Sequence, residues 1–231
     1  MPRLLLLLPT TTYRTQAFLD AAWRLGVEMT VGSDRAHVLA EHRPTGTLAL
    51  NFLDPEEAAR TVVEFAREQP IDAVVGVDDD TTVLAAVISA ALSLPHNSVA
   101  SASAAKNKHR MRELLDREGV PVPPYALFSI DDDPVALARR VTYPCVVKPL
   151  ILSASRGVIR ADDEAQFVAA FRRLEAILRM PEVATRGDAA WQVLVEAFVP
   201  GREVALEGLL SKGDLQVLAL FDKPDPLDGP F

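Results

Sequence analysis

Short apolar runs alternate with helical repeats of apolar residues along the first hundred residues of the chain. Residues 4–8 are five leucines followed by a proline and three threonines, a pattern typical of a strand buried on both faces. Apolar residues then recur at helical spacing over residues 15–25, and Gly26 ends that pattern. The same alternation predicts strands at residues 27–31, 47–52 and 71–77 and helices at residues 55–68 and 82–92. We therefore predict a parallel sheet covered by helices on both faces, in an α/β unit at residues 1–97.

The second half of the chain does not repeat this alternation. Residues 101–118 predict an amphipathic helix that Gly119 ends, and the proline-rich residues 120–124 predict an extended linker. A further helix is expected after Asp162 and Asp163. Strands are expected at residues 141–150, 192–199, 203–210 and 216–221, with the second and third joined in a hairpin at residues 200–201, before a turn-rich segment at residues 222–231. This order predicts an α+β domain, with a domain boundary near residues 97–105.

Composition and charge narrow the classes of protein. The 231 residues include 24 Lys+Arg and 32 Asp+Glu, and the resulting net charge of −8 argues against a nucleic-acid partner or binding to an anionic membrane. No apolar run approaches the roughly 20 residues that a membrane helix needs. A single cysteine, Cys145, excludes an internal disulfide framework and a cysteine-cluster zinc site. We therefore expect a soluble protein of a reducing compartment, the cytoplasm.

Several common catalytic motifs are absent from the sequence. It contains neither G-x-x-x-x-G-K-[ST] nor G-x-G-x-x-G after a strand, the signatures of P-loop and standard dinucleotide-binding proteins. It has no G-x-S-x-G elbow, and its four histidines show no metal-ligand spacing. Residues 10–12 and 78–80 lie just after predicted strands, and ligands often bind at the carboxyl ends of such strands. We prefer the interpretation that Thr and Asp cap helices there, because three aspartates alone do not define a metal site.

A lysine in an apolar strand and the loop that follows it point to a different chemistry. Lys148 lies within the apolar residues 145–149, and a buried ammonium group needs an anionic partner unless its stem carries the charge out to water at a sheet edge. Residues 152–158 then combine small and hydroxyl side chains with one Arg and one Gly, which lets backbone N–H groups approach phosphate oxygens. An ordinary hairpin turn has a similar composition. The lysine and the loop together favour a phosphate site.

Five segments that include this lysine and loop follow one another in order: Asn107–Lys108, residues 120–123, residues 143–149, residues 153–157 and residues 195–203. Their order and spacing resemble the ATP-grasp superfamily, most closely its carboxylate–amine ligases, with the biotin-carboxylase-like members as neighbours. The resemblance covers essentially the whole chain. It implies a Rossmann-like parallel α/β domain at residues 1–97 before an incomplete α+β ATP-grasp domain at residues 98–231, with a small lid subdomain at about residues 125–197.

The resemblance also implies an ATP site with a phosphate side and an adenosine side. The phosphate side would consist of two lysines and a mobile loop that closes over them: Lys108, Lys148, Ser153, Ser155, Arg156 and Gly157. The adenosine side would consist of two carboxylates and two backbone positions: Glu196, Ala197, Val199 and Glu203. Glu196 would face the adenine amino group, the backbone of Ala197 and Val199 the ring edge, and Glu203 the ribose hydroxyls.

The reaction implied by the resemblance has two steps. A carboxylate attacks the γ-phosphoryl group of ATP to form an acyl phosphate, and an amine or a similar nucleophile then displaces phosphate, with Mg²⁺ neutralising the nucleotide. The magnesium ligands of this family lie on strands beyond residue 231, so we expect no metal ligand in this chain. We therefore expect a piece of a longer ligase that is inactive alone, and we assign no catalytic residue.

The sequence leaves the partners partly open. A small-molecule carboxylate and an amine are the implied substrates, and the exposed sheet edges of an α/β domain are compatible with a homodimer. The alternatives are a non-catalytic nucleotide-binding module and a fragment of a biotin-carboxylase-type carboxylase. A third alternative is a solute-binding protein without a nucleotide, in which Lys148 and Glu203 would be ordinary surface charges. An incomplete grasp domain should also expose apolar surface, so we predict self-association.

Overall fold

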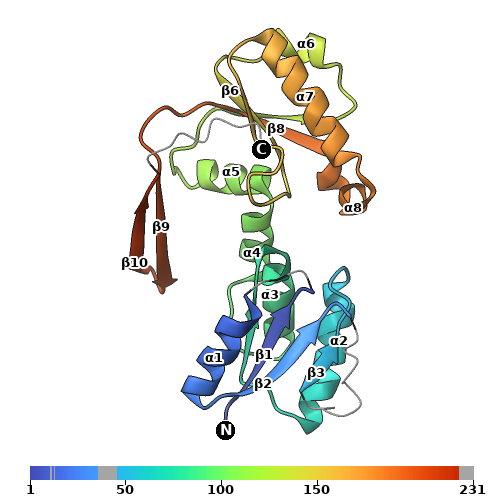
Figure 1. Cartoon of the computed structure of the whole chain (residues 1–231), viewed down its shortest axis with the longest axis vertical. Coiled ribbons are helices and arrows are strands. Elements are labelled where there is room, and N and C mark those ends of the chain that lie inside the picture. The colour runs from blue at the N-terminus through green and yellow to red at the C-terminus, as the bar shows by residue number, and fades with distance from the viewer. Residues whose placement is uncertain (11, 13, 36–45, 224–231) are drawn as a thin grey trace. The chain divides into compact units, whose positions relative to one another are not determined.

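The computed structural model describes residues 1–10, 12, 14–35 and 46–223. It forms two compact units, Met1–Lys106 and Asn107–Phe231, each with its own buried core (Figure 1). The predicted turn-rich segment at residues 222–231 lies outside the described residues from residue 224 onward.

The first unit contains a four-stranded parallel sheet in the order β3-β2-β1-β4. Its strands are β1 (Arg3–Leu8), β2 (Glu28–Ser33), β3 (Thr47–Ala49) and β4 (Ala73–Gly76). Its helices are α1 (Thr15–Leu25), α2 (Pro55–Glu68), the 3-10 helix η2 (Asp79–Thr81), α3 (Thr82–Ala91) and α4 (Val99–Lys106). The predicted parallel α/β unit is thereby confirmed.

The leucine run of β1 forms the centre of this sheet, and its side chains alternate between two cores. Leu5 and Leu7 pack with residues of α2 and α3 on one face, whereas Leu6 and Leu8 pack with Phe18 of α1 on the other. Leu5, Leu6 and Leu7 are completely buried. Burial on both faces explains why this strand is uninterrupted by polar residues, as predicted.

Local capping defines the helix ends of the first unit where the sequence predicted them. Gly26 ends α1 with a left-handed backbone (φ 63°, ψ 37°), which glycine adopts without steric cost. At the start of α2, Pro55 is the first helical residue and the Asp54 carboxylate accepts a hydrogen bond from the Glu57 N–H at 2.9 Å. Both helices therefore begin and end within the predicted ranges.

The second unit is built on a four-stranded antiparallel sheet in the order β5-β8-β6-β7. Its strands are β5 (Tyr125–Ser129), β6 (Cys145–Pro149), β7 (Ile159–Ala161) and β8 (Gln192–Ala197). Its helices are α5 (Lys108–Arg117), α6 (Pro134–Ala138), α7 (Glu164–Leu178), α8 (Pro181–Ala184) and the 3-10 helix η3 (Asp188–Trp191). Two further strands, β9 (Val204–Ser211) and β10 (Asp214–Asp222), form a separate antiparallel hairpin.

The two faces of this sheet have different chemistry because side chains alternate along each strand. Cys145 and Val147 of β6 face the core that Phe167 and Phe171 of α7 complete. Burial raises the pKa of the Cys145 thiol to about 11, which is typical of an unreactive structural cysteine. Lys148, the residue after Val147, therefore lies on the opposite face, away from the α7 core.

The single helix predicted at residues 101–118 is two helices. The α4 helix ends at Lys106 and α5 begins at Lys108, because Asn107 adopts an extended backbone and its side-chain oxygen accepts a hydrogen bond from the Arg110 N–H at 3.0 Å. Asparagine favours such N-cap positions over a helix interior. Because the apolar pattern continues across Asn107, the sequence did not predict this break.

The predicted hairpin between residues 192–199 and 203–210 is wrong. The β8 strand instead lies between β5 and β6, and β9 pairs with β10 across a turn at Lys212 and Gly213. Both turn residues have positive φ (52° and 91°), as tight hairpin turns that match strand twist require. Prolines at residues 121–124 predicted only a linker there, so the short strand β5 that follows them was missed.

Candidate functional site

A buried carboxylate and two partly buried cations of the second unit meet on the face of its sheet opposite α7. Strand register places Glu196 of β8 opposite Val146 of β6, so Lys148, two residues further along β6, is its diagonal neighbour. Lys148 Nζ donates a hydrogen bond to Glu196 Oε2. Glu196 is only 5 % exposed, which makes this carboxylate a buried anion.

A second cation reaches the same carboxylate from α5. Arg112 donates from Nε to Glu196 Oε1 at 2.7 Å and from Nη2 to Oε2 at 3.4 Å. A guanidinium that grips both carboxylate oxygens fixes the orientation of the side chain as well as its charge. Lys148, Glu196 and Arg112 form a buried charge cluster, which we call the Glu196 cluster.

The Glu196 cluster has one net positive charge, because its two cations share a single carboxylate. Burial lowers the pKa of Lys148, Arg112 lowers it further, and the hydrogen bond and the negative charge of Glu196 oppose both effects. The side chain of Lys148 keeps 14 % of its surface exposed. Such a site favours an incoming anion, because one carboxylate is shared by two cations.

Lys108, the other predicted phosphate lysine, lies at the first position of α5 and contacts the loop after β6. Its Nζ donates to the carbonyl oxygens of Leu152 at 2.6 Å and Leu150 at 3.4 Å, and its N–H donates to the Leu150 carbonyl at 3.2 Å. Lys148 is itself a residue of β6, and Lys108 is hydrogen-bonded to carbonyl groups of the residues that follow β6.

The predicted phosphate loop is an exposed turn with an unusual backbone. Ser153, Ala154, Ser155 and Arg156 are exposed, and Ala154 and Ser155 have consecutive positive φ angles of 53° and 58°. The Arg156 N–H donates to the Ser153 carbonyl at 3.2 Å, which closes the turn. Two consecutive left-handed residues are rare outside glycine, and such strained backbone clusters at ligand sites.

Gly157 anchors this loop to the core. Its φ is +77°, it is buried, and a Cβ atom placed on it would lie 2.8 Å from Leu174 Cδ1 of α7. The position therefore requires glycine for its backbone angle and for its close contact. Arg156 points to α8, where its Nη2 lies 3.2 Å from Met180 Sδ and 3.4 Å from Glu182 Oε1.

The end of β8 is held by its neighbours on both sides. The Ala197 N–H donates to the Pro124 carbonyl at 2.9 Å, and the Phe198 N–H donates to the Pro144 carbonyl at 3.0 Å. The residue that follows, Val199, is 68 % exposed. The predicted adenine edge is thus a braced strand end that opens to solvent at Val199.

Glu203, the predicted ribose carboxylate, belongs to the base of the β9–β10 hairpin. It forms an ion pair with Lys223, and its neighbour Arg202 pairs with Asp222 at 2.6 Å. The structure therefore brings together Lys148 and Glu196, and attaches Lys108 to the loop, but gives Glu203 a different local partner.

Sequence reasoning missed two contributors to this face of the sheet. Arg112 follows Lys108 by four residues, which is one helical turn, so their shared helix face was a readable signal. Arg160 of β7 places its guanidinium carbon 4.2 Å from the centre of the Phe198 ring, a cation–π contact that only tertiary structure reveals. Arg112 in particular could not be paired with Glu196 from sequence, because 84 residues separate them.

Among the described residues of 10–12 and 78–80 the predicted side-chain capping is not found, because the N-cap residues of α1 and η2, Arg14 and Asp78, form no side-chain cap hydrogen bond. Thr11 lies outside the described residues. The Thr10 N–H donates to the Asp34 carboxylate at 3.0 Å. Asp79 and Asp80 accept hydrogen bonds from Lys106 Nζ at 2.8 and 2.6 Å instead of capping a helix. Within the described part of the chain, no three His, Cys, Asp or Glu side chains are grouped so that they could hold a metal ion.

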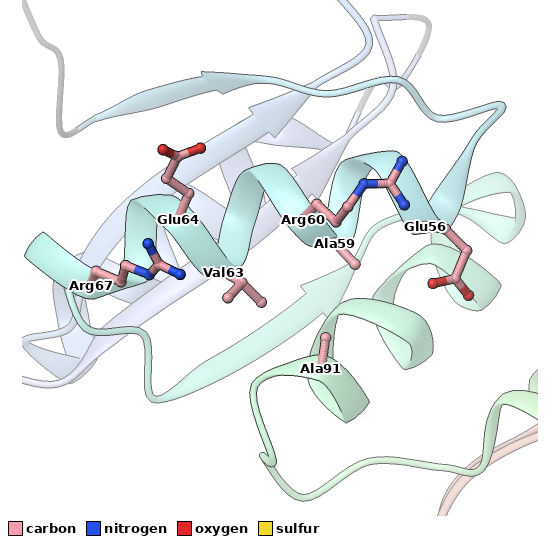
Figure 2. Close-up of a pocket in the computed structure, with 7 residues that line it drawn as sticks. All are labelled: Glu56, Ala59, Arg60, Val63, Glu64, Arg67 and Ala91. Atoms are coloured by element: carbon pink, nitrogen blue, oxygen red, sulfur yellow. The ribbon is translucent and has the colours of Figure 1, made fainter.

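Two hollows lie on the first unit, and the predicted residue Asp79 lines one of them. Figure 2 shows a groove of about 380 Å³ along α2, whose charged side chains Glu56, Arg60, Glu64 and Arg67 project from one helix beside Ala91. Another hollow, of about 640 Å³, is lined by residues of α3, of α4 and of the segment between them, including His96 and Lys106. Neither contains a cation–carboxylate cluster as deeply buried as the Glu196 cluster.

None of the described helices is long and apolar enough to cross a membrane.

Two domain families match separate parts of the chain. Residues 19–96 match the ATP-grasp N-terminal domain and residues 141–230 match the ATP-grasp domain. A phosphoribosylamine–glycine ligase of Allochromatium vinosum is 30% identical over 161 residues, which is 68% of this chain and 36% of that ligase. The chain therefore spans little more than a third of that relative.

Solved structures share the fold over almost the whole chain. An L-amino acid ligase from Bacillus licheniformis superposes with a TM-score of 0.72 at 23% identity, over 98% of this chain and 52% of that one. The biotin carboxylase domain of the 2-oxoglutarate carboxylase from Hydrogenobacter thermophilus, solved with MgADP and bicarbonate, gives 0.63 at 16% identity, over 94% and 49%. At these identities the likeness concerns the fold, and the chain spans about half of each solved chain.

Proposed function

The chain belongs to the ATP-grasp superfamily, and from that premise we propose that it forms the nucleotide-binding part of an ATP-dependent carboxylate–amine ligase. The observation that supports this most directly is the Glu196 cluster, in which the predicted lysine Lys148 and the predicted adenine carboxylate share one sheet face. The exposed loop of small and hydroxyl residues begins at Ser153, shortly after Lys148 in the chain. The ligase named above and the solved L-amino acid ligase are consistent with this assignment.

The phosphate side of the proposed site combines charge with an adaptable loop. Lys148 would exchange part of its contact with Glu196 for the phosphate oxygens, and Lys108 would add a second ammonium group from the start of α5. Ser153, Ser155 and Arg156 would close over the phosphates, while Gly157 holds the end of the loop against α7. Ammonium groups suit this role because they neutralise phosphate as compact point charges.

The adenosine side of the proposed site uses the braced end of β8. Glu196 would face the adenine amino group, with the backbone of Ala197 and Val199 along the ring edge. Glu203 would hold the ribose hydroxyls after exchanging its ion pair with Lys223. Binding adenosine would therefore reorganise the hairpin base more than the strand end.

The proposed reaction places the chemistry on the substrates. A carboxylate oxygen of the acid substrate attacks the γ-phosphorus and ADP leaves; the amine then attacks the acyl carbon and phosphate leaves. Positioning and charge neutralisation are the contributions of the protein. ATP-grasp ligases carry out this chemistry with Mg²⁺, but the described residues contain no group of carboxylates that fits the ion, so we assign it no ligand and no catalytic residue.

Calorimetric titration of the purified chain with ADP and MgCl₂ tests the nucleotide site. We expect wild type to bind, and Lys148→Ala to weaken binding by roughly thirtyfold or more, because a partly buried cation is lost from the phosphates. Lys212→Ala is the matched control, since Lys212 is an exposed lysine in the β9–β10 turn. Equal binding by wild type and Lys148→Ala would contradict the proposal, as would the absence of ADP binding in wild type.

A further inference from the structure

We propose that Arg112 is a positioning residue of the nucleotide site, which keeps Glu196 ionised and in place when Lys148 leaves that carboxylate for a phosphate. This role rests on the proposed function, because it presupposes that a nucleotide binds at Lys148. Arg112 would act on the nucleotide through Glu196, without contacting the phosphates itself.

The two cations of the Glu196 cluster form different hydrogen bonds with the carboxylate. Lys148 contacts Oε2 alone, whereas Arg112 reaches both Oε1 and Oε2. If Lys148 turns to a phosphate, the bidentate contact of Arg112 keeps a donor on each carboxylate oxygen. The carboxylate then keeps its orientation, which a single remaining point contact would not ensure.

The α5 helix gives Arg112 a fixed position. Asn107 caps the helix, and Lys108 at its first position binds the carbonyl groups of Leu150 and Leu152. Arg112 lies one turn further along and binds β8 through Glu196. The same helix thus connects the loop that follows β6 with the strand that carries the proposed adenine carboxylate.

Electrostatics explain why a second cation is needed at Glu196. Keeping the charge of a carboxylate that is only 5 % exposed is costly without a partner, because burial penalises the charged form. In wild type Arg112 remains when Lys148 leaves. Without Arg112, the departure of Lys148 would leave the carboxylate buried without a cation, and it would take up a proton instead.

The titratable and charged groups around Glu196 come from every neighbouring element. Lys148 faces it from β6 and Arg112 from α5. Tyr125 of β5 is its cross-strand partner, and the ring of His109 from α5 stands edge-on to Tyr125 at 5.7 Å. Arg160 of β7 lies on the same face, two strands away, over Phe198. Of these groups, Arg112 and Lys148 form the ion pairs with the carboxylate.

The first test compares ADP binding by wild type and Arg112→Met, titrated with MgCl₂ in two buffers of different ionisation enthalpy at pH 7. We expect Arg112→Met to bind roughly tenfold more weakly, and to take up as much as one more proton per ADP than wild type. Protons exchanged by ADP itself cancel in this comparison. Arg112→Lys should restore part of both properties, because it keeps the charge but loses the bidentate grip.

Arg110→Met is the matched control, because Arg110 lies on the same helix and pairs with Glu113 at 3.1 Å on the surface. It should leave ADP affinity and proton uptake unchanged. If Arg112→Met matches wild type in both quantities while wild type binds ADP, the role proposed for Arg112 is refuted. If wild type itself binds no ADP, the proposed function fails instead.

A double-mutant cycle with Glu196→Gln separates action through Glu196 from direct contact with the nucleotide. In the Glu196→Gln background no carboxylate remains to be neutralised, so adding Arg112→Met should weaken ADP binding no further. This comparison also remains available if Arg112→Met alone fails to fold. An additional loss of roughly tenfold in the double variant would overturn the proposal, because Arg112 would then contact the nucleotide directly.

Discussion

Glu196 and Gly157 show how single residues define the proposed site. Glu196 is held by Lys148 and Arg112 against the cost of burying its charge. Gly157 has a left-handed backbone and lies close to the Leu174 side chain. Lys148 could be predicted as a functional residue because a charge inside an apolar strand is unfavourable without a partner. The Arg112 contact could not, because the helix and the strand that carry the pair meet only in the folded unit.

The close contact of Gly157 predicts a specific loss of stability at the residue scale. Gly157→Ala should lower the free energy of unfolding of the second unit by about 2–4 kcal/mol, the sum of a left-handed backbone penalty and overpacking against Leu174. Gly119→Ala, at φ +73° with nothing within 4 Å of the added methyl group, should cost only the backbone part, about 1–2 kcal/mol.

Urea denaturation in a Trp23→Phe background measures both changes, because Trp191 of the second unit is then the remaining tryptophan. Equal losses in the two variants would show that the contact between Gly157 and Leu174 contributes nothing.

Among the elements, the strands of the first unit were the easiest to predict, and those of the second unit the hardest. A buried parallel strand such as β1 has an uninterrupted apolar sequence that identifies it. In the second unit, β8 and β9 are apolar segments that follow one another in the chain, yet they pair with different partners. Such pairing depends on long-range contacts and on the turn at Lys212 and Gly213. The local sequence pattern favoured a hairpin turn at Pro200 instead.

The β9–β10 hairpin carries the element-scale prediction. Strand register places a set of apolar side chains on one of its faces, all of them more than half exposed: Leu206, Leu210, Leu215, Val217 and Leu220. A two-stranded hairpin with an uncovered apolar face favours association. We therefore expect the chain to self-associate as its concentration rises, and the double variant Leu210→Lys/Leu220→Lys to reduce that association.

Sedimentation velocity over a concentration series tests this expectation. Leu53→Lys is the control, since Leu53 is 89 % exposed but lies in the first unit. A wild-type chain that stays monomeric at every concentration would contradict the prediction, and so would an equal effect of Leu53→Lys.

At the scale of the whole molecule, sequence order carried more information than any single segment. The alternation of apolar runs predicted an α/β domain and five short segments in order predicted an ATP-grasp domain after it, and the two matching domain families and the two four-stranded sheets confirm that fold class. The resemblance assigned both Lys148 and Glu196 to the ATP site, but it did not predict their contact, because the two residues are distant in sequence. The local partner of Glu203 at the hairpin base could not be predicted, because it depends on the β9–β10 pairing.

The central claim is that the nucleotide binds to the sheet face of the second unit that carries the Glu196 cluster. Backbone amide chemical shifts of the isotope-labelled chain, followed by NMR during titration with ADP and MgCl₂, test it most directly. The account predicts that the largest shifts occur in β6, in residues 153–157, at the end of β8 and in α5. Largest shifts along α2 or around η2 in the first unit, or no shifts at all, would contradict it.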